Sequence, residues 1–414
     1  MRGRRVVITG LGAITPLGQD KNQLWSALIE GKSGIKKITL FDASSCEVHI
    51  AGEVQDFDPT RWFDQKQARR LDRFVQFAVA ASTVAVEDAG LDFNKTDRDK
   101  VGVIIGSGIG GIHEIEEQHS ILLQKGPSRV SPFMIPRLMV NAAPGQVAIK
   151  YQIYGPNFSI VSACASGAHA IGEAFRIVQM GEADVMITGG SEATITPLCV
   201  GGFSSMKALS TRNNDPERAS RPFDKERDGF VISEGAGIVV LEELNHAKQR
   251  NAKIYAELIG YGKSADASHI AAPDPEGRGA CVSMRNALND AQRSPEDISY
   301  INAHATSTPL GDEVEIKAIK TVFNQHANKL VISSTKSMLG HQLGAAGSVE
   351  LLICALALQH NVVPPTINYE TPDPKCNGLD FVPNEAREMK LETAMSNSFG
   401  FGGHNVSLII GRCT

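Results

Sequence analysis

The sequence predicts an α/β fold made of two related halves, with sheets that are covered by helices. Short β-rich runs alternate with longer helical stretches, which is the pattern of an α/β protein. Several of these runs are apolar almost throughout, as strands buried on both faces are. Two segments that each hold a strand, a turn and a helix also resemble each other. The 414 residues are enough for two or three domain-sized units around a large core.

The predicted strands are spread along the whole chain. The runs Val-Gly-Val-Ile-Ile at 101–105 and Gly-Ile-Val-Val-Leu at 237–241 are the most uniformly apolar, so we expect them to be covered by helices on both faces. The full set of predicted strands is 5–10, 100–106, 159–163, 183–189, 237–242, 254–260, 299–303, 330–334 and 407–411.

Two segments indicate a duplicated architecture. Residues 158–179 read as a strand, Cys164 and a helix, and residues 330–359 read as a strand, Lys336, a glycine-rich turn and a helix. The helices begin with alanines and glycines, and their glycines lower helix propensity. We therefore expect both helices to pack too closely for larger side chains, at the centre of the fold.

The boundary between the halves is predicted at a polar stretch, residues 245–253, that leads into a further strand. Nothing in its composition indicates a flexible linker. We therefore expect an N-terminal domain at 1–250, which holds the candidate nucleophilic cysteine, and a C-terminal domain at 251–414, which holds two candidate catalytic histidines.

Composition and charge exclude several classes of protein. Lys and Arg total 41 against 46 Asp and Glu, and aromatic residues make up 6%, so a nucleic-acid partner is not expected. The seven cysteines form no CxxC pair, which argues against a disulfide framework and a cysteine zinc site. The first residues lead directly into a strand without a signal peptide, and the longest apolar run, 351–358, is too short to span a bilayer. We expect a cytoplasmic protein without a membrane segment.

Cys164 is the first candidate for chemistry. It ends an apolar run and precedes a helix that begins with Ala-Ser-Gly, so its sulfur is expected near free backbone amides. The dipole of a helix N-terminus favours a thiolate, and nearby N–H groups could hold the oxyanion that forms when the thiolate attacks a carbonyl. The alternative is a buried, unreactive cysteine.

His304 and His341 are the second candidates. Each follows a strand or a glycine-rich turn in the second half, where an α/β fold places its ligand crevice. Two neutral imidazoles that donate to one oxygen would stabilise an enolate. A metal site would want a third ligand at tight spacing, which the sequence does not offer, so no metal is expected. Structural histidines are the alternative.

Lys336 and Glu315 lie close in sequence to these histidines. We expect the ammonium and the carboxylate to balance each other near the same centre. A purely structural ion pair is the alternative, and both roles can coexist in one buried network.

Two glycine-rich segments could bind a ligand. Residues 106–111 satisfy GxGxxG after a strand, but the acidic residue expected some 20 positions later is missing, which weakens a dinucleotide site. Residues 397–404, Asn-Ser-Phe-Gly-Phe-Gly-Gly-His, offer backbone amides beside aromatic rings, or else form a tight structural turn. No P-loop occurs, so ATP-driven chemistry has no support.

A basic cluster is the remaining candidate surface. It could bind an acidic partner, although such charges are usually solvated. Its members are Lys66, Arg69, Arg70, Arg73, Lys207 and Arg212.

Taken together, four ordered motifs resemble the condensing enzymes. They are Ser-Ala-Cys-Ala-Ser-Gly around Cys164, His-Ala-Thr-Ser-Thr-Pro from His304, the run from Thr335 to Gly347 that contains Lys336 and His341, and Asn-Ser-Phe-Gly-Phe-Gly-Gly at 397–403. The nearest group is the elongating β-ketoacyl-[acyl carrier protein] synthases, closest to type II. The resemblance runs from Val-Ile-Thr-Gly-Leu-Gly at 7–12 to the last strand.

The resemblance implies a fold, a reaction and partners. The fold is thiolase-like, with five layers, α-β-α-β-α, from two duplicated halves, and the enzyme is a homodimer. The reaction is a decarboxylative Claisen condensation with malonyl-[acyl carrier protein] that lengthens a fatty acyl chain by two carbons. No cofactor is expected, because phosphopantetheine arrives on the carrier protein.

The resemblance also implies roles at the reacting centre. Cys164 accepts the acyl chain, and the backbone amides of Cys164 and Phe401 form the oxyanion hole. His304 and His341 promote decarboxylation and stabilise the enolate. Lys336, paired with Glu315, supports them.

Further residues are implied in substrate binding. Thr306 and Thr308 contact the phosphopantetheine arm, and Phe401 is a gating aromatic. Ile109 and Phe203 line the acyl tunnel, and Phe399 is counted with the substrate-binding residues. The surface for the acidic carrier protein is implied at Lys66, Arg69, Arg70 and Lys207.

Other activities remain as alternatives. A Cys-His-His set argues against initiating synthases, which use Cys-His-Asn, and the absence of a second cysteine in a Cys-Gly-Gly setting argues against thiolases. A dehydrogenase that uses the glycine loop at 106–111 is one competing hypothesis. A catalytically silent subunit that shapes a sister enzyme's tunnel is another, and the intact thiol and histidines speak against it.

Overall fold

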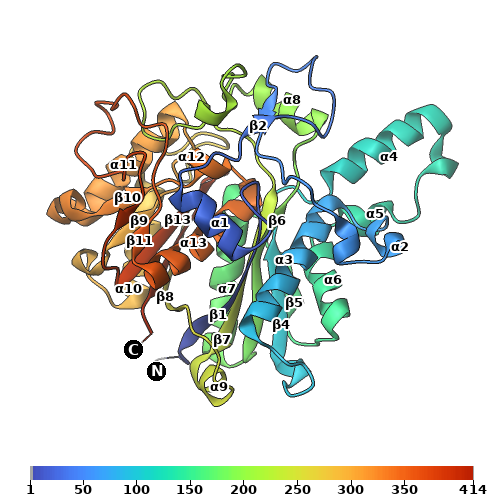
Figure 1. The fold of residues 1–414 in the computed structure, drawn as a ribbon, viewed down its shortest axis with the longest axis horizontal. Coiled ribbons are helices and arrows are strands. Elements are labelled where there is room, and N and C mark those ends of the chain that lie inside the picture. Colours follow the sequence, from blue (N-terminus) through green and yellow to red (C-terminus); the bar gives the residue numbers. More distant parts are fainter. Residues whose placement is uncertain (1–2, 414) are drawn as a thin grey trace.

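A computed structural model describes residues 3–413, and ten strands dominate it (Figure 1). They form one continuous sheet in which the two halves of the chain meet where β1 pairs antiparallel with β8, from Val6 to Ile8. In sheet order the strands are β10 (Val331–Ser333), β9 (Tyr300–Asn302), β13 (Thr393–Gly400), β14 (His404–Gly411), β8 (Ala256–Ala265), β1 (Val6–Ile14), β7 (Gly235–Glu243), β6 (Val185–Glu192), β4 (Val101–Gly106) and β5 (Asn157–Phe158).

The two halves of this sheet have the same topology. In the first half, β1, β7 and β6 pair antiparallel in turn, and β4 and β5 then continue in parallel with β6. In the second half, β8, β14 and β13 pair antiparallel in turn, and β9 and β10 continue in parallel with β13. The predicted duplication is therefore confirmed strand by strand.

Helices cover both half-sheets on both faces. Helix α3 (Arg73–Ala89) packs on β1 and β7, and α10 (Arg278–Ala291) packs on β8 and β14, which makes two outer layers. Helices α7 (Ser166–Met180) and α13 (Ala346–His360) contact each other between the half-sheets, at the centre of Figure 1. The layers are thus α-β-α-β-α, and the predicted thiolase-like architecture is confirmed.

The remaining elements are shorter or lie outside these layers. Helices α4 and α5 form an arm that projects from the body of the molecule (Figure 1). These elements are α1 (Lys21–Ile29), α2 (Gln65–Ala68), α4 (Ile112–Lys125), α5 (Met134–Leu138), α6 (Ala142–Tyr151), α8 (Pro197–Ser205), α9 (Leu244–Gln249), α11 (Pro309–Phe323), α12 (Lys336–Leu339), β2 (Lys36–Lys37), β3 (Ile50–Ala51), β11 (Val362–Val363) and β12 (Arg387–Glu388).

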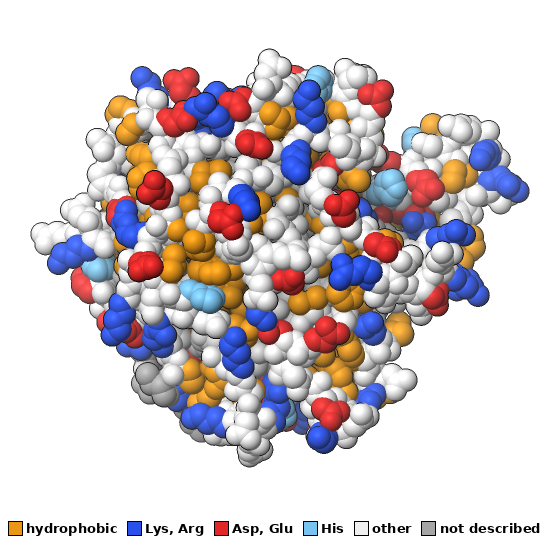
Figure 2. Space-filling view, viewed as in Figure 1, with side chains coloured by type: hydrophobic (Ala, Val, Ile, Leu, Met, Phe, Trp, Pro, Cys, Tyr) orange, Lys and Arg blue, Asp and Glu red, His pale blue; other side chains and the backbone are white. Residues whose placement is uncertain are grey.

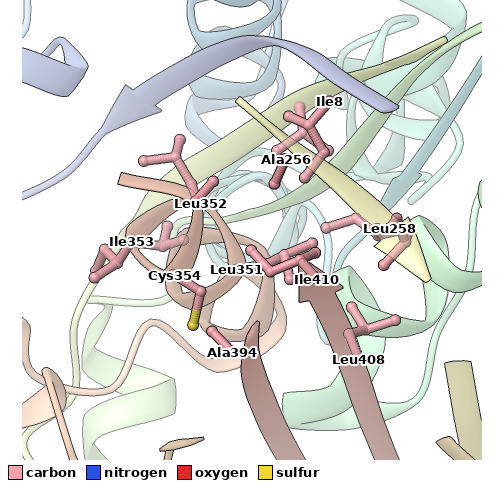
Figure 3. Packing of buried hydrophobic residues seen from close by; sticks show 14 of the residues in the cluster. Ile8, Ala256, Leu258, Leu351, Leu352, Ile353, Cys354, Ala394, Leu408 and Ile410 are labelled. Atoms are coloured by element: carbon pink, nitrogen blue, oxygen red, sulfur yellow. The ribbon is translucent and has the colours of Figure 1, made fainter. Parts of the chain in front are cut away.

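Helix α13 forms the middle of the largest core cluster. Every side chain from Ala346 to Leu358 is buried, and Figure 3 shows Leu351, Leu352, Ile353 and Cys354 among residues of β1, β8, β13 and β14. The stretch Leu343–His360 is long and apolar enough to cross a membrane, but 89% of it is buried in the fold. Its apolar surface is therefore used for packing, where truncation of one leucine to alanine costs about 2–5 kcal/mol.

The ten-stranded sheet differs from the predicted strands at two places, and the short pairs β2–β3 and β11–β12 outside it were not predicted. The strand predicted at 159–163 is wrong, because pairing ends at Phe158 and the chain continues irregularly to a 3₁₀ turn at Ala163–Ala165. Strand β13 was not predicted, because Thr-Ala-Met-Ser-Asn-Ser-Phe-Gly is neither apolar nor alternating. Among its buried polar side chains, Asn397 accepts a hydrogen bond from Ser407 and donates one to Glu315, whereas the hydroxyls of Ser396 and Ser398 have no partner among the described residues. The predicted domain boundary near residue 250 stays a prediction.

Candidate active site

The centre of the candidate site is a tight turn before each of the two central helices. Cys164 lies in the 3₁₀ turn Ala163–Ala165 that opens α7, and Gly344 lies in the corresponding turn Leu343–Ala345 that opens α13. Ala163 and Leu343 both have positive φ, at 50° and 45°, although neither is a glycine. The turns are thus equivalent, and the counterpart of Cys164 in the second half is Gly344 rather than Lys336.

Cys164 is buried, and its sulfur lies beside backbone N–H groups. The amides of Phe401 and of Cys164 itself donate to the sulfur. Strand β13 comes this close because Gly400 has no side chain: a Cβ there would lie 2.7 Å from Ser162 O and 3.1 Å from Cys164 N. Two converging amides at a helix N-terminus form the geometry that stabilises an oxyanion.

Burial controls the protonation of Cys164. It raises the pKa of the thiol to about 12, and the charge of Lys336 and then the two amides oppose this shift only in part. The expected thiolate is therefore not the resting form. The thiol stays protonated until a partner takes its proton.

His341 is positioned to be that partner. Its Nε2 lies 3.0 Å from the sulfur of Cys164, and the ring of His304 stands nearly perpendicular to it at a centroid distance of 5.3 Å. Burial, and next the charge of Lys336, hold the pKa of both imidazoles well below 6.5. Both rings are therefore neutral near pH 7. A neutral imidazole can accept a proton at one ring nitrogen and donate a hydrogen bond from the other.

The three side chains also have the donor set of a soft metal site. The sulfur of Cys164 and one ring nitrogen each of His304 and His341 all lie within 4.8 Å of one another. Thiolate sulfur and imidazole nitrogen are the ligands that Zn²⁺ prefers. These residues could hold such an ion in competition with the substrate. The sequence analysis weighed a metal at the two histidines but did not count the thiol of Cys164 as the third ligand.

The predicted pairing of Lys336 with Glu315 is wrong. Lys336 forms a buried ion pair with Glu350 of α13, and Glu315 instead accepts the backbone N–H groups of His304 at 2.9 Å and of Ala305 at 2.7 Å. The turn of α12 directs Lys336 toward helix α13. Glu315 on α11 lies instead next to the backbone of the loop that begins at His304. Burial raises the pKa of Glu315 to about 7, against the effect of those amides. Glu315 therefore holds the backbone of His304 in place.

Two functional carboxylates were missed by the sequence analysis. Glu350 is the one charged residue between Ala346 and Leu358, and a lone charge in so apolar a stretch was a usable signal of a buried ion pair. Glu192 ends β6 and accepts four hydrogen bonds from segments distant in sequence, which no local pattern reveals.

A cavity of about 620 Å³ opens beside Cys164. Ile109 and Phe203 belong to the same apolar cluster as Cys164, and Thr306 and Thr308 share a hydrogen bond of 3.1 Å. All the predicted substrate-binding residues line this cavity. Its lining includes Ile109, Phe203, His304, Thr306, Thr308, Glu315, His341, Phe399 and Phe401, with Lys207. Apolar and polar walls thus meet at the thiol.

The predicted basic surface is only partly assembled. Lys66, Arg69 and Arg70 are exposed in and after α2, whereas Arg73 is held by the buried Glu234. Lys207 is exposed at the cavity and pairs with Glu47. Figure 2 shows basic and acidic side chains interspersed over the viewed face rather than one uniform patch.

The glycine loop at 106–111 does not offer its amides to a ligand. The N–H groups of Gly108 and Ile109 donate to Glu192, and that of Gly110 donates to Ser107. A dinucleotide pyrophosphate would need these same donors at the start of the helix. The loop forms a wall of the cavity instead, which removes the main support for a dehydrogenase.

Comparisons with known proteins agree with this geometry. The family description "Beta-ketoacyl synthase, N-terminal domain" matches residues 3–247, and "Beta-ketoacyl synthase, C-terminal domain" matches residues 255–370. The chain belongs to the β-ketoacyl synthase family. The predicted family is thereby confirmed.

Relatives of the chain match along nearly its whole length. A protein of Coxiella burnetii named 3-oxoacyl-[acyl-carrier-protein] synthase 2 is 57% identical over 412 residues, 100% of this chain and 99% of the relative. A protein of Synechocystis with the same name is 54% identical and covers 98% of this chain and 97% of the relative.

Solved structures share the fold. A β-ketoacyl synthase from Burkholderia phymatum has a TM-score of 0.91 and 35% identity, with 99% of this chain and 100% of that chain covered. A structure of a type II polyketide synthase acyl-carrier protein in complex with its ketosynthase matches with a TM-score of 0.92 and 36% identity, and covers 99% of this chain and 100% of that chain. The family's fold is thus present along the described chain.

Proposed function

We propose that the protein is an elongating 3-oxoacyl-[acyl carrier protein] synthase of fatty acid biosynthesis, an acyltransferase. The observation that carries this proposal is the convergence of His341 and of two backbone amides on the sulfur of Cys164. The relatives named 3-oxoacyl-[acyl-carrier-protein] synthase 2 support the same reaction.

In the first step, the acyl group moves from carrier protein to Cys164. The thiol transfers its proton toward Nε2 of His341 as the sulfur attacks the thioester carbonyl. The amides of Cys164 and Phe401 stabilise the oxyanion, and the phosphopantetheine thiol leaves with the proton. Phe401, as the aromatic beside this hole, gates entry to the cavity.

In the second step, malonyl-carrier protein enters the same cavity. Neutral His304 and His341 donate to the thioester oxygen, so that loss of CO₂ leaves an enolate that they stabilise. The enolate carbon attacks the Cys164 thioester, and the sulfur leaves to give a 3-oxoacyl chain two carbons longer. Thr306 and Thr308 hold the phosphopantetheine arm at the polar wall. Lys336 supports the centre by its charge.

The proposal includes two protein partners. Acyl carrier protein is acidic in this scheme and approaches Lys66, Arg69, Arg70 and Lys207, which are all exposed. The solved ketosynthase in complex with its acyl-carrier protein supports this kind of partner. The second partner is another copy of this chain: β5 ends the sheet with both residues exposed, and nearby α5 exposes Ile135.

The remaining parts of the proposal are a cytoplasmic location and independence from any cofactor, nucleic acid or membrane. Both substrates arrive bound to a carrier protein, and the buried thiol and imidazoles supply the acid-base chemistry. The relatives' name, 3-oxoacyl-[acyl-carrier-protein] synthase 2, supports substrates that are carried by an acyl carrier protein.

The test is the mass of the intact protein after mixing with a long-chain acyl-carrier protein. We expect one thioester adduct, mapped to Cys164 and absent from Cys164→Ser. His304→Ala should reduce condensation more than acylation, whereas His341→Ala should reduce both steps, because Nε2 of His341 also accepts the proton of the Cys164 thiol. The absence of an adduct across several acyl lengths would favour the silent-subunit alternative, and normal elongation by either histidine variant would refute the roles assigned.

A further inference from the structure

Glu192 accepts hydrogen bonds from both sides of the catalytic cavity. One side is the glycine loop: Ser107 Oγ donates at 2.7 Å, Gly108 N at 2.6 Å and Ile109 N at 3.2 Å. The other side is the turn before α13, where Gly344 N donates at 3.0 Å. Its side chain is fully buried. One carboxylate thus joins two segments that are separate in sequence.

The duplicated fold explains what this carboxylate replaces. Glu192 ends β6, and Gly400 ends the equivalent strand β13; Gly344 is the counterpart of Cys164. At the reacting centre, Gly400 has no side chain, so the backbone of β13 approaches the amide of Cys164 closely. At the equivalent point of the other half, Glu192 has a side chain, and its carboxylate accepts the amide of Gly344.

The four partners require an ionised carboxylate. Each of them is a donor, namely one hydroxyl and three backbone N–H groups, and a carboxylate accepts at both oxygens. A glutamine of the same shape would place an NH₂ group against one or two of these N–H groups. Burial raises the pKa of Glu192, and its four hydrogen-bond donors oppose that shift by stabilising the ionised carboxylate.

Both segments that Glu192 joins lie at the cavity beside Cys164. Gly108 and Ile109 line one of its walls, and His341 and Leu343 line another next to Gly344. We propose that Glu192 is a positioning residue that holds the Ile109 wall at a fixed distance from Cys164 and His341, and so determines which chain lengths fit the cavity. The link to acyl chains rests on the proposed function.

The test compares small and long electrophiles at Cys164. Glu192→Gln is treated with iodoacetamide and with its N-dodecyl derivative, and the ratio of the two alkylation rates is measured by intact mass. We expect this ratio to change about fivefold to tenfold from the parent, because several charge-assisted hydrogen bonds are lost. Ser107→Ala removes one of the donors and should change the ratio in the same direction by about two- to threefold.

Glu53→Gln is the matched control. Glu53 is also buried, and it accepts Thr39 N, Thr39 Oγ1 and Leu40 N, none of which lines the cavity. A general loss of stability would lower the melting temperature in both variants without a change in the ratio. Ratios within about twofold of the parent in Glu192→Gln and Ser107→Ala would overturn the proposal.

Acylation by octanoyl- and hexadecanoyl-carrier protein then tests the same wall with natural substrates. The length preference of Glu192→Gln should shift in the same direction as its alkylation ratio. If the parent takes up neither acyl group while the alkylation ratio still shifts, the proposed function fails and the positioning role stands. Unchanged preference and unchanged ratio together refute the role and leave the function intact.

Discussion

Removal of one charge from the Lys336–Glu350 pair should destabilise the protein strongly. The two side chains are 2% and 3% exposed, between α12 and α13, so neither ion has water as an alternative partner. Glu350→Gln keeps the volume and one acceptor oxygen but removes the negative charge. Lys336 then remains as a buried cation without its counter-ion.

The size of the effect follows from this burial. At a separation of about 4 Å, two unit charges attract by about 4 kcal/mol when the effective dielectric constant is about 20. Removing one partner from buried pairs costs about 3–5 kcal/mol in measured cases. Burial raises the pKa of Glu350 to about 7, so the comparison is made at about pH 9, where its carboxyl is ionised. We therefore expect the free energy of unfolding of Glu350→Gln to fall by about 3–5 kcal/mol, a large share of ordinary stability.

The assay is urea denaturation of the parent, Glu350→Gln and the double variant Lys336→Met/Glu350→Leu. Replacing both ions with apolar side chains of similar size should recover most of the loss, because no unpaired charge stays buried. A loss of less than about 0.5 kcal/mol in the single variant would refute the reasoning. So would a double variant that is no more stable than the single one.

Three further predictions concern the reacting centre. Alkylation of Cys164 by iodoacetamide should rise about tenfold per pH unit from about pH 7 to about pH 10, because its pKa is about 12; a plateau near pH 7 would contradict this. Gly400→Ala should lower kcat/KM about 10²–10³-fold, as loss of an oxyanion donor does, because the new Cβ would displace β13 from Cys164 N. Thermal unfolding of the same variant is the control for stability. Zn²⁺ should slow alkylation of Cys164, and His304→Ala should weaken this protection at least about tenfold; equal protection in both would exclude the three-ligand site.

Much of the site was predictable because its motifs are local. Cys164 follows an apolar run and precedes a helix of small residues, and His304 and His341 stand in polar or glycine-rich turns. These features arise from short-range requirements of turns and helix starts. The structure brings all three side chains to one point, as predicted.

The partners of these residues depended on long-range packing. Lys336 was paired with Glu315 because each lies close in sequence to one of the histidines. The turn of α12 instead directs the Lys336 side chain to Glu350. Glu192 meets donors from residues 107–109 and from Gly344, and only the assembled halves show this. The thiolate expected at a helix N-terminus was outweighed by burial, which a sequence does not display.

The position of β14 in the sheet has a consequence for biosynthesis. This strand follows all the others along the described chain, yet it lies between β8 and β13 and pairs with both. Until it emerges from the ribosome, the second half-sheet exposes two unpaired edges on either side of a gap. The first half has its strands complete once β7 is made, long before that moment. We expect nascent chains to require protection from aggregation through most of the synthesis of the second half.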